Sequence, residues 1–289
     1  MDRELVLGID FNNMLFGSYY GEPLVNSDGM NVNAIKGFFF KIKFLKDTFN
    51  PKYIVFANDL SRDKTFRRKL YKAYKDHRKP KDPDILVQLQ EASSLVSLLG
   101  YPMISNEEYE ADDVLGMISK FTYDNDMDMI IVSSDKDLYQ LLNEKVFVFS
   151  PRGKELIDLE WLDGNYRLTP TQWIEFKMLM GDRSDNIPGI DGIGEITALR
   201  LMQQFGCIEN IYKHLNQLKP ALKEALENGE KNLQLIRELV TIITDYSIIG
   251  LEKKMLETKA RHADAVYRTI ERLEVPSLFN VMRYSLLLD

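Results

Sequence analysis

The run LVLGID, residues 5–10, decides the fold that we expect for this chain. It is short, apolar and rich in branched side chains, as β-strands are, and it ends on an aspartate, Asp10. Further strands of this kind are expected over residues 53–57, 102–104, 129–133 and 146–149, and helical spacing covers 34–48, 85–99, 111–123 and 138–142. Strands that alternate with helices predict an α/β fold, with a mostly parallel central sheet and helices on both faces.

The second part of the chain has a different pattern. After Trp161 the strand signal fades and helical spacing dominates. These helices are expected over residues 170–180, 195–205, 208–215, 220–228 and 233–245. We therefore expect two domains, an α/β domain over residues 1–166 and a helical domain over residues 167–289.

Composition limits the cellular setting of the protein. Cys207 is the single cysteine among 289 residues, which excludes an intramolecular disulfide and a cysteine-rich zinc site. No apolar segment approaches the length of a membrane span, and the run at residues 5–9 is too brief for a secretory signal. We expect a cytoplasmic protein in a reducing compartment.

Acidic side chains stand where predicted strands end or where short loops open helices. They are Asp10, Asp59, Glu110, Asp112, Asp113, Asp135, Asp137, Asp182 and Asp185. Asp10, Asp59 and Asp135 follow three different strands, and the carboxyl ends of parallel strands meet at one edge of a sheet. We therefore expect the carboxylates to converge there. Removing these nine negative charges from the net charge of −7 leaves +2 for the remaining surface.

Such a cluster needs an explanation in terms of charge. Like charges about 4 Å apart repel by roughly 4 kcal/mol per pair at an effective dielectric near 20. Many oxygen ligands together select hard divalent cations, above all Mg²⁺, with Mn²⁺ as a substitute. Two such ions would support an attack on a phosphodiester. Each acidic run alone could simply cap a helix, but the agreement of five positions along the chain favours the metal site.

A basic stretch lies between the second and third predicted strands. Residues 62–81 hold ten Lys or Arg against two Asp. A charge run alone is most often a solvated helix face. Phe66, Tyr71 and Tyr74 interleave with these cations, however, which combines phosphate neutralisation with surfaces for base stacking. The stretch therefore predicts binding of single-stranded nucleic acid.

A glycine-rich loop precedes the helix expected near Glu195. Its sequence, GIDGIG over residues 189–194, permits backbone amides to approach a phosphate at a helix amino terminus. A tight turn between two helices is the alternative reading of so short a motif.

The order of these motifs resembles the bacterial and phage 5′ nucleases, the flap endonuclease family that includes the amino-terminal domain of DNA polymerase I. The resemblance covers most of the chain and implies a stand-alone member. It implies an inner set of metal ligands and a set of neighbouring or second-site ligands. The inner set is Asp10, Asp59, Glu110, Asp112 and Asp135, and the other set is Asp113, Asp137, Asp182 and Asp185.

The resemblance also implies DNA-binding elements. A helical arch near residues 62–100 would cover the site, with Lys75 and Arg78 as catalytic phosphate clamps, assisted in DNA binding by Arg67 and Tyr74. A helix-hairpin-helix, part of a helix-three-turn-helix module, would grip duplex DNA and bridge to it through K⁺. Its implied contacts are Gly189, Gly192, Gly194 and Thr197. Glu195 and Ile196 replace the Pro and Lys that are common in relatives, which removes one cationic contact.

The function implied is metal-dependent cleavage of DNA near 5′ ends. The substrates would be flaps, nicks and RNA primers, in replication and repair. We expect a monomer that associates with the nucleoid through DNA and works beside replication or repair proteins. Two alternatives are a ribonuclease of the related PIN-like architecture and a DNA-junction binding protein without activity.

Overall fold

The computed structural model of the chain describes residues 3–60 and 63–286. A six-stranded sheet forms its centre, in the order β3-β2-β1-β4-β5-β6. The first five of these strands are parallel, and β6 runs antiparallel to β5. The strands are β1 (Leu5–Asp10), β2 (Tyr53–Ala57), β3 (Met103–Ile104), β4 (Asp128–Val132), β5 (Val146–Ser150) and β6 (Glu155–Ile157). The predicted α/β class and mostly parallel sheet are confirmed.

Side chains of neighbouring residues in each strand enter two separate cores. Val6 packs into one hydrophobic cluster and Leu7 into the other, as strand geometry requires. Every residue of β2 is buried, because helices cover both faces of the sheet. Only β6 was not predicted, since it is short and two of its three residues are exposed.

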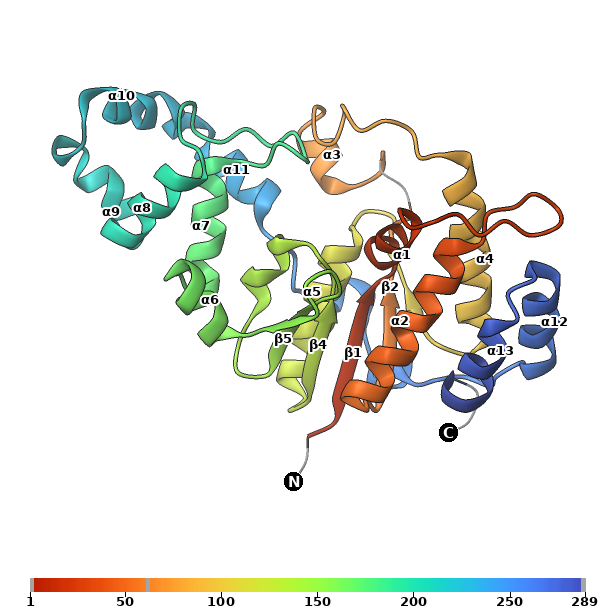
Figure 1. Ribbon diagram of the computed structural model, residues 1–289. Coiled ribbons are helices and arrows are strands. Elements are labelled where there is room, and N and C mark those ends of the chain that lie inside the picture. The colour runs from red at the N-terminus through yellow and green to blue at the C-terminus, as the bar shows by residue number, and fades with distance from the viewer. Residues whose placement is uncertain (1–2, 61–62, 287–289) are drawn as a thin grey trace.

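Helices from both ends of the chain cover one face of the sheet. The other face is covered by α5 and by the helices α6 to α11 over residues 159–240, which we call the helical region (Figure 1). On the first face lie α1 (Phe11–Tyr19), α2 (Asn33–Phe49), α4 (Pro83–Leu98), α12 (Ala263–Leu273) and α13 (Ser277–Val281). The others are α3 (Phe66–Leu70), α5 (Ala111–Asp124), α6 (Leu159–Tyr166), α7 (Pro170–Met180), α8 (Glu195–Phe205), α9 (Ile208–Lys213), α10 (Pro220–Gly229) and α11 (Leu233–Val240). The 3₁₀ helices are η1 (Lys136–Leu141), η2 (Leu215–Gln217), η3 (Glu230–Asn232), η4 (Tyr246–Ile249) and η5 (Lys253–Leu256), and η6 (Met282–Leu286) is a π-helix.

The carboxyl-terminal part of the chain returns to the α/β core. After α11 the chain passes along α5, and α12 and α13 then pack on α4 and α2. Val266, Ile270 and Leu273 of α12 recur at helical spacing and are buried in this core. The division into domains at residue 167 stays a prediction, and α12 and α13, which it places in the helical domain, pack against helices of the α/β core.

The arch expected near residues 62–100 stays a prediction, and its first residue lies outside the described part of the chain. α3 and the turns that follow it lie above the carboxyl ends of the strands (Figure 1). α4 instead packs against α1, α2 and α12, so residues 83–98 belong to the layer that covers the sheet. The helical spacing of this segment reflects burial in that layer. In the part of the chain that the structure describes, no helix is long and apolar enough to cross a membrane.

The contact between α5 and the returning chain provides a test of the fold. Gly116 lies in α5, and a Cβ there would meet Ile242 Cγ2 at 2.5 Å and the carbonyl oxygen of Ile243 at 2.6 Å. We expect Gly116→Ala to lower the free energy of unfolding by about 1–3 kcal/mol, because a backbone carbonyl must move. Denaturant unfolding measures the change.

A second glycine supplies the matched control. Gly164 lies in α6, and a Cβ there would meet nothing within 4 Å. Gly164→Ala is expected to raise the free energy of unfolding by about 0.5–1 kcal/mol, because alanine favours helix. Equal effects of the two substitutions would contradict the close approach at Gly116.

Candidate active site

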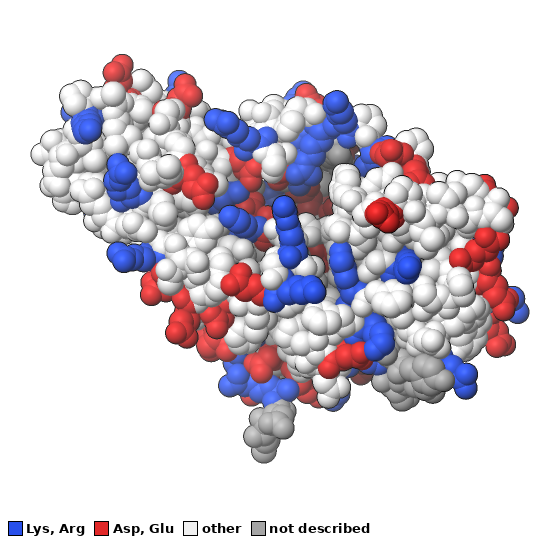
Figure 2. Space-filling view, in the orientation of Figure 1, with Lys and Arg blue, Asp and Glu red and all other residues white. Residues whose placement is uncertain are grey.

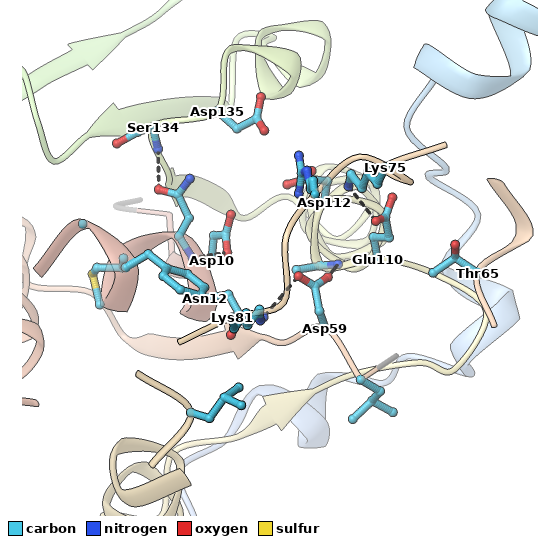
Figure 3. Close-up of a pocket in the computed structure, with 18 of the residues that line it drawn as sticks. Asp10, Asn12, Asp59, Thr65, Lys75, Lys81, Glu110, Asp112, Ser134 and Asp135 are labelled. Carbon is cyan, nitrogen blue, oxygen red and sulfur yellow. Dashed lines mark hydrogen bonds and ion pairs between the residues drawn. The ribbon is translucent and has the colours of Figure 1, made fainter. Parts of the chain in front are cut away.

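A cleft of about 1210 Å³ opens at the carboxyl ends of the parallel strands. Its floor is acidic and its rim is basic, as the central hollow in Figure 2 shows. Five of the nine predicted metal ligands line it: Asp10, Asp59, Glu110, Asp112 and Asp135. They come from the end of β1, the loop after β2, the start of α5 and the loop after β4, and their side chains surround one space (Figure 3).

Asp10 and Asp59 are held by hydrogen bonds from neighbouring elements. Asp10 is the N-cap of α1 and accepts from the Asn13 amide at 3.0 Å and from the Ser133 hydroxyl at 3.0 Å. Asp59 accepts from the backbone amide of Ala111, at the start of α5, at 2.8 Å. Asn12 Nδ2 donates to its other oxygen at 3.1 Å. Each carboxylate therefore has a fixed direction before any ligand binds.

Glu110 and Asp112 extend from the amino terminus of α5. Glu110 is the N-cap of this helix and accepts from the Tyr74 hydroxyl and from Lys75 Nζ, both at 2.6 Å. Asp112 lies in the first turn and lines the cleft. Within residues 3–60 and 63–286 its side chain accepts no hydrogen bond and forms no ion pair.

Burial and mutual repulsion disfavour negative charge on this floor. Burial, followed by the charge of Asp59, raises the pKa of Asp10 to about 7. Burial, followed by the charges of Asp135 and Asp10, raises the pKa of Asp112 well above its usual value. A cation placed among these groups would reverse both shifts, because opposite charge favours the ionised form.

The donor set fits a hard divalent cation in kind. All five groups are carboxylates, and Asp112 has oxygens without a partner in the described chain. No three acidic, His or Cys side chains of the described residues are close enough to enclose a metal ion as they stand. Repulsion between like charges keeps the carboxylate oxygens apart, and a bound cation would have to draw these oxygens together.

The other four predicted ligands lie outside the lining of the cleft. Lys177 Nζ lies 2.6 Å from Asp137 and 2.6 Å from Asp182, and Asp185 pairs with Arg78 and, at 3.4 Å, with Lys75. The five predicted inner ligands therefore line the cleft, the four predicted neighbours or second-site ligands lie beyond its lining, and the metal roles of all nine stay predictions. Cations of the protein itself neutralise those four.

Lys177 shows how this neutralisation works. Burial alone would lower its pKa, but Asp137 and Asp182 outweigh burial and raise it. Asp137 still has a pKa of about 7, because burial and the charge of Asp135 exceed the opposing effect of Lys177. Burial would likewise raise the pKa of Asp182, but Lys177 more than offsets it and the pKa is lowered.

Burial argues against the roles predicted for Arg67, Asp113 and Tyr74. Arg67 is only 3% exposed and holds Asp113, which is fully buried, through two contacts of 2.5 and 2.8 Å. Neither side chain reaches the surface that DNA would contact. Tyr74 is 2% exposed, and its ring packs into the core while its hydroxyl donates to Glu110. It cannot stack on a base.

Lys75 and Arg78, the predicted phosphate clamps, line the cleft. The turns that carry them are tied to the loop after α7, because the Lys75 amide donates to the Asp185 carbonyl at 2.8 Å. Lys75 has a positive φ of 54°, and its side chain extends to Glu110. Arg78 is at the rim, with its guanidinium on Asp185.

Several cleft residues were missed by sequence reasoning. Asn12, Asn13, Lys41, Lys81 and Arg152 also line the cleft. Asn12 and Asn13 come two and three residues after Asp10, and that position was a usable signal. Lys81 lies in the basic stretch. Lys41 and Arg152 carried no signal, since their approach to the cleft depends on how α2 and the turn after β5 pack.

The glycine loop joins α7 to α8 as predicted. Gly192 has a φ of +80°, and a Cβ at Gly194, the N-cap of α8, would meet open space. Exposed backbone therefore precedes α8, and Thr197 is half-buried in its first turn. Gly189 has a different role, because a Cβ there would lie 2.4 Å from the Met180 carbonyl carbon. It permits two backbone segments to pack.

Comparison with known families gives two matches along the chain. Residues 5–167 match the family described as 5′-3′ exonuclease, N-terminal resolvase-like domain. Residues 168–264 match the family described as 5′-3′ exonuclease, C-terminal SAM fold.

Two relatives illustrate the similarity. The thermostable DNA polymerase I of Thermus thermophilus is 36% identical over 277 residues, which cover 95% of this chain and 32% of that protein. The chain thus spans about a third of the length of such polymerases. The 5′-3′ exonuclease of Halalkalibacterium halodurans is 33% identical over 289 residues, covering 94% of this chain and 94% of that protein.

Solved structures share the fold. A zinc-bound structure of the phage T5 5′-exonuclease has a TM-score of 0.71 at 21% identity and covers 93% of this chain and 99% of its own. A phage T5 flap endonuclease, in a pseudo-enzyme-product complex with DNA and metal ions, has a TM-score of 0.67 at 19% identity. That match covers 94% of this chain and 100% of its own.

The unpartnered carboxylate of Asp112 provides a test of the site. We expect Asp112→Asn to weaken Mn²⁺ binding by about tenfold or more, because the cleft loses one anionic ligand. Isothermal titration calorimetry measures the affinity. Asp124→Asn, which changes an exposed ion pair on the same helix, should bind Mn²⁺ like the parent. The same affinity in both variants would argue against a ligand role for Asp112.

Proposed function

The chain belongs to the 5′-3′ exonuclease family, whose members are metal-dependent phosphodiester hydrolases, and we propose that it cleaves branched or nicked DNA near 5′ ends. The observation that carries the proposal is one cleft with an acidic floor and a basic rim. Its floor is built for cations and its rim for phosphates.

The rim recruits the negatively charged backbone of DNA. Lys41, Lys75, Arg78, Lys81 and Arg152 line the cleft together with the five carboxylates. The bare floor would repel a phosphate, whereas the rim attracts it, so productive binding requires that the negative floor be neutralised. This charge arrangement supports strict metal dependence.

Divalent cations, when bound, supply Lewis acidity toward phosphate and water. Asp10, Asp59, Glu110, Asp112 and Asp135 would hold them. We propose Mg²⁺ as the cation used in cells, with Mn²⁺ as a substitute and two ions at full occupancy. Ligands for a second ion would have to come partly from the outer aspartates, and Lys177 or Arg78 would then leave them.

Lys75 and Arg78 act on the phosphate that is cleaved. Burial would lower the pKa of Lys75, but Glu110 and Asp185 outweigh it and raise the pKa, so the ammonium stays charged. Its Nζ can turn from Glu110 to a phosphate oxygen that enters the cleft. Arg78, at the rim, offers a planar fork that suits a second phosphate. Both cations stabilise negative charge that develops on phosphorus oxygens.

The exposed loop at Gly192 and Gly194 would contact duplex DNA. Its backbone amides at the start of α8 suit a phosphate, and this loop would hold K⁺, whose positive charge would favour DNA. Exposed Glu195 and Ile196, the latter 76% exposed, follow immediately and add no positive charge. Duplex binding at this loop therefore depends on backbone groups.

The proposed substrates are 5′ flaps, nicks and RNA primers in replication and repair. We further propose a monomer associated with the nucleoid through DNA, beside replication or repair proteins. Support for DNA comes from the charge of the cleft and from the DNA complex of the phage T5 flap endonuclease.

The decisive experiment incubates the protein and Mg²⁺ with labelled flap DNA, nicked duplex and single-stranded RNA. We expect cleavage of the DNA substrates near their 5′ ends. Asp135→Asn should abolish turnover and retain DNA binding, because it removes a cleft carboxylate without touching the rim. Cleavage of RNA alone would favour a PIN-like ribonuclease. Binding without cleavage would favour a junction-binding protein.

A second experiment separates Lys75 from general attraction of DNA. Lys75→Ala is expected to slow single-turnover cleavage of a flap by about 100-fold or more, because a buried donor to the phosphate is lost. Lys79→Ala changes an exposed lysine of the same segment that does not line the cleft. It should cleave at nearly the parental rate. Equal rates in the two variants would exclude a special role for Lys75.

A further inference from the structure

A buried ion pair lies behind the cleft and takes no part in its lining. Arg67 Nη1 and Nη2 contact the two oxygens of Asp113 at 2.5 and 2.8 Å, in the paired geometry that guanidinium and carboxylate favour. Asp113 is fully buried, and Arg67 is nearly so. A charge pair removed from water in this way is costly unless every donor and acceptor is used.

The remaining donors of Arg67 reach a third element. Its Nε donates to the Leu239 carbonyl at 2.8 Å and its Nη2 to the Thr241 carbonyl at 2.9 Å. Leu239 lies in the last turn of α11, where a positive charge is favoured by the helix dipole. Arg67 therefore fastens α3 to the end of the helical region.

Asp113 completes the connection on the other side. Its oxygens accept from the Glu110 amide at 3.1 Å and from the Ile243 amide at 3.0 Å. The first contact fixes the opening turn of α5, which carries Glu110 and Asp112 into the cleft. The second fixes the chain just after α11.

We propose that Arg67 and Asp113 form a positioning pair that sets the direction of the Glu110 and Asp112 carboxylates in the cleft. This inference rests on the proposed function only for its catalytic consequence. Neither side chain touches substrate. The pair holds three segments, α3, the start of α5 and the end of α11, in one arrangement, so that the helical region and the acidic floor are fixed relative to each other.

The obvious objection is that the pair only stabilises the fold. Removing one partner leaves an unpaired buried charge, whereas neutralising both is often tolerated. Comparison of the single variant Arg67→Met with the double variant Arg67→Met/Asp113→Asn makes use of this difference. The single variant is expected to lose stability. The double variant should recover most of it, because both charges of the pair are removed together and Asn keeps an oxygen for the Glu110 amide.

The test compares three quantities for both variants: thermal unfolding, Mn²⁺ affinity by calorimetry, and single-turnover cleavage of a flap with Mg²⁺. In the double variant we expect near-parental stability, with Mn²⁺ affinity and cleavage rate each still reduced about tenfold. Recovery of all three would overturn the proposal and leave a structural role. If the parent protein cleaves nothing, the proposed function fails, but Mn²⁺ affinity still decides the positioning role.

Two further variants serve as a control and as a substitute for the double variant. Arg237→Met removes another arginine, exposed on α11 and paired with Glu175, and should match the parent in all three measurements. Arg67→Lys serves if the double variant does not fold. Its single ammonium cannot hold both Asp113 oxygens and two carbonyls, so we expect a measurable loss of Mn²⁺ affinity. Parental Mn²⁺ affinity in Arg67→Lys would contradict the proposal.

Discussion

Repulsion among carboxylates at one edge of the sheet is the constraint on which this structure depends. Parallel strands bring Asp10, Asp59 and Asp135 to the same edge, and α5 adds Glu110 and Asp112. Burial makes the repulsion stronger, as the raised pKa values of Asp10 and Asp112 indicate. Lys75 and Arg67 relieve part of this repulsion at Glu110, whereas the side chain of Asp112 forms no ion pair within the described residues.

Around the floor, acidic side chains pair with cations of the same chain. Lys177 lies between Asp137 and Asp182, Arg67 holds Asp113, and Arg78 pairs with Asp185. The contrast separates two kinds of acidic residue. Those outside the cleft build the fold and fasten the loop after α7, whereas those inside remain available to an added cation. A divalent ion and a phosphate backbone are the partners that suit such a division.

The sequence was sufficient for features that depend on local pattern. Apolar runs placed five strands, and the rule that ligands gather at the carboxyl ends of parallel strands placed Asp10, Asp59 and Asp135 together. Pattern alone could not separate Asp112 from Asp113, because adjacent helical residues differ only in the neighbours that they meet. Arg67 and Lys177 decide which acids are neutralised, and both reach their partners from other elements through tertiary packing. The return of α12 and α13 to the sheet depends on such packing as well.

The central claim is that the cleft carboxylates bind divalent cations. Crystals soaked in Mn²⁺ test it most directly, because anomalous scattering locates the metal independently of activity. The account predicts a strong anomalous peak within coordination distance, about 2.0–2.6 Å, of oxygens from Asp112 and at least one other carboxylate of the cleft. A cleft without anomalous density, or Mn²⁺ bound only at the exposed acids of the surface, would contradict it.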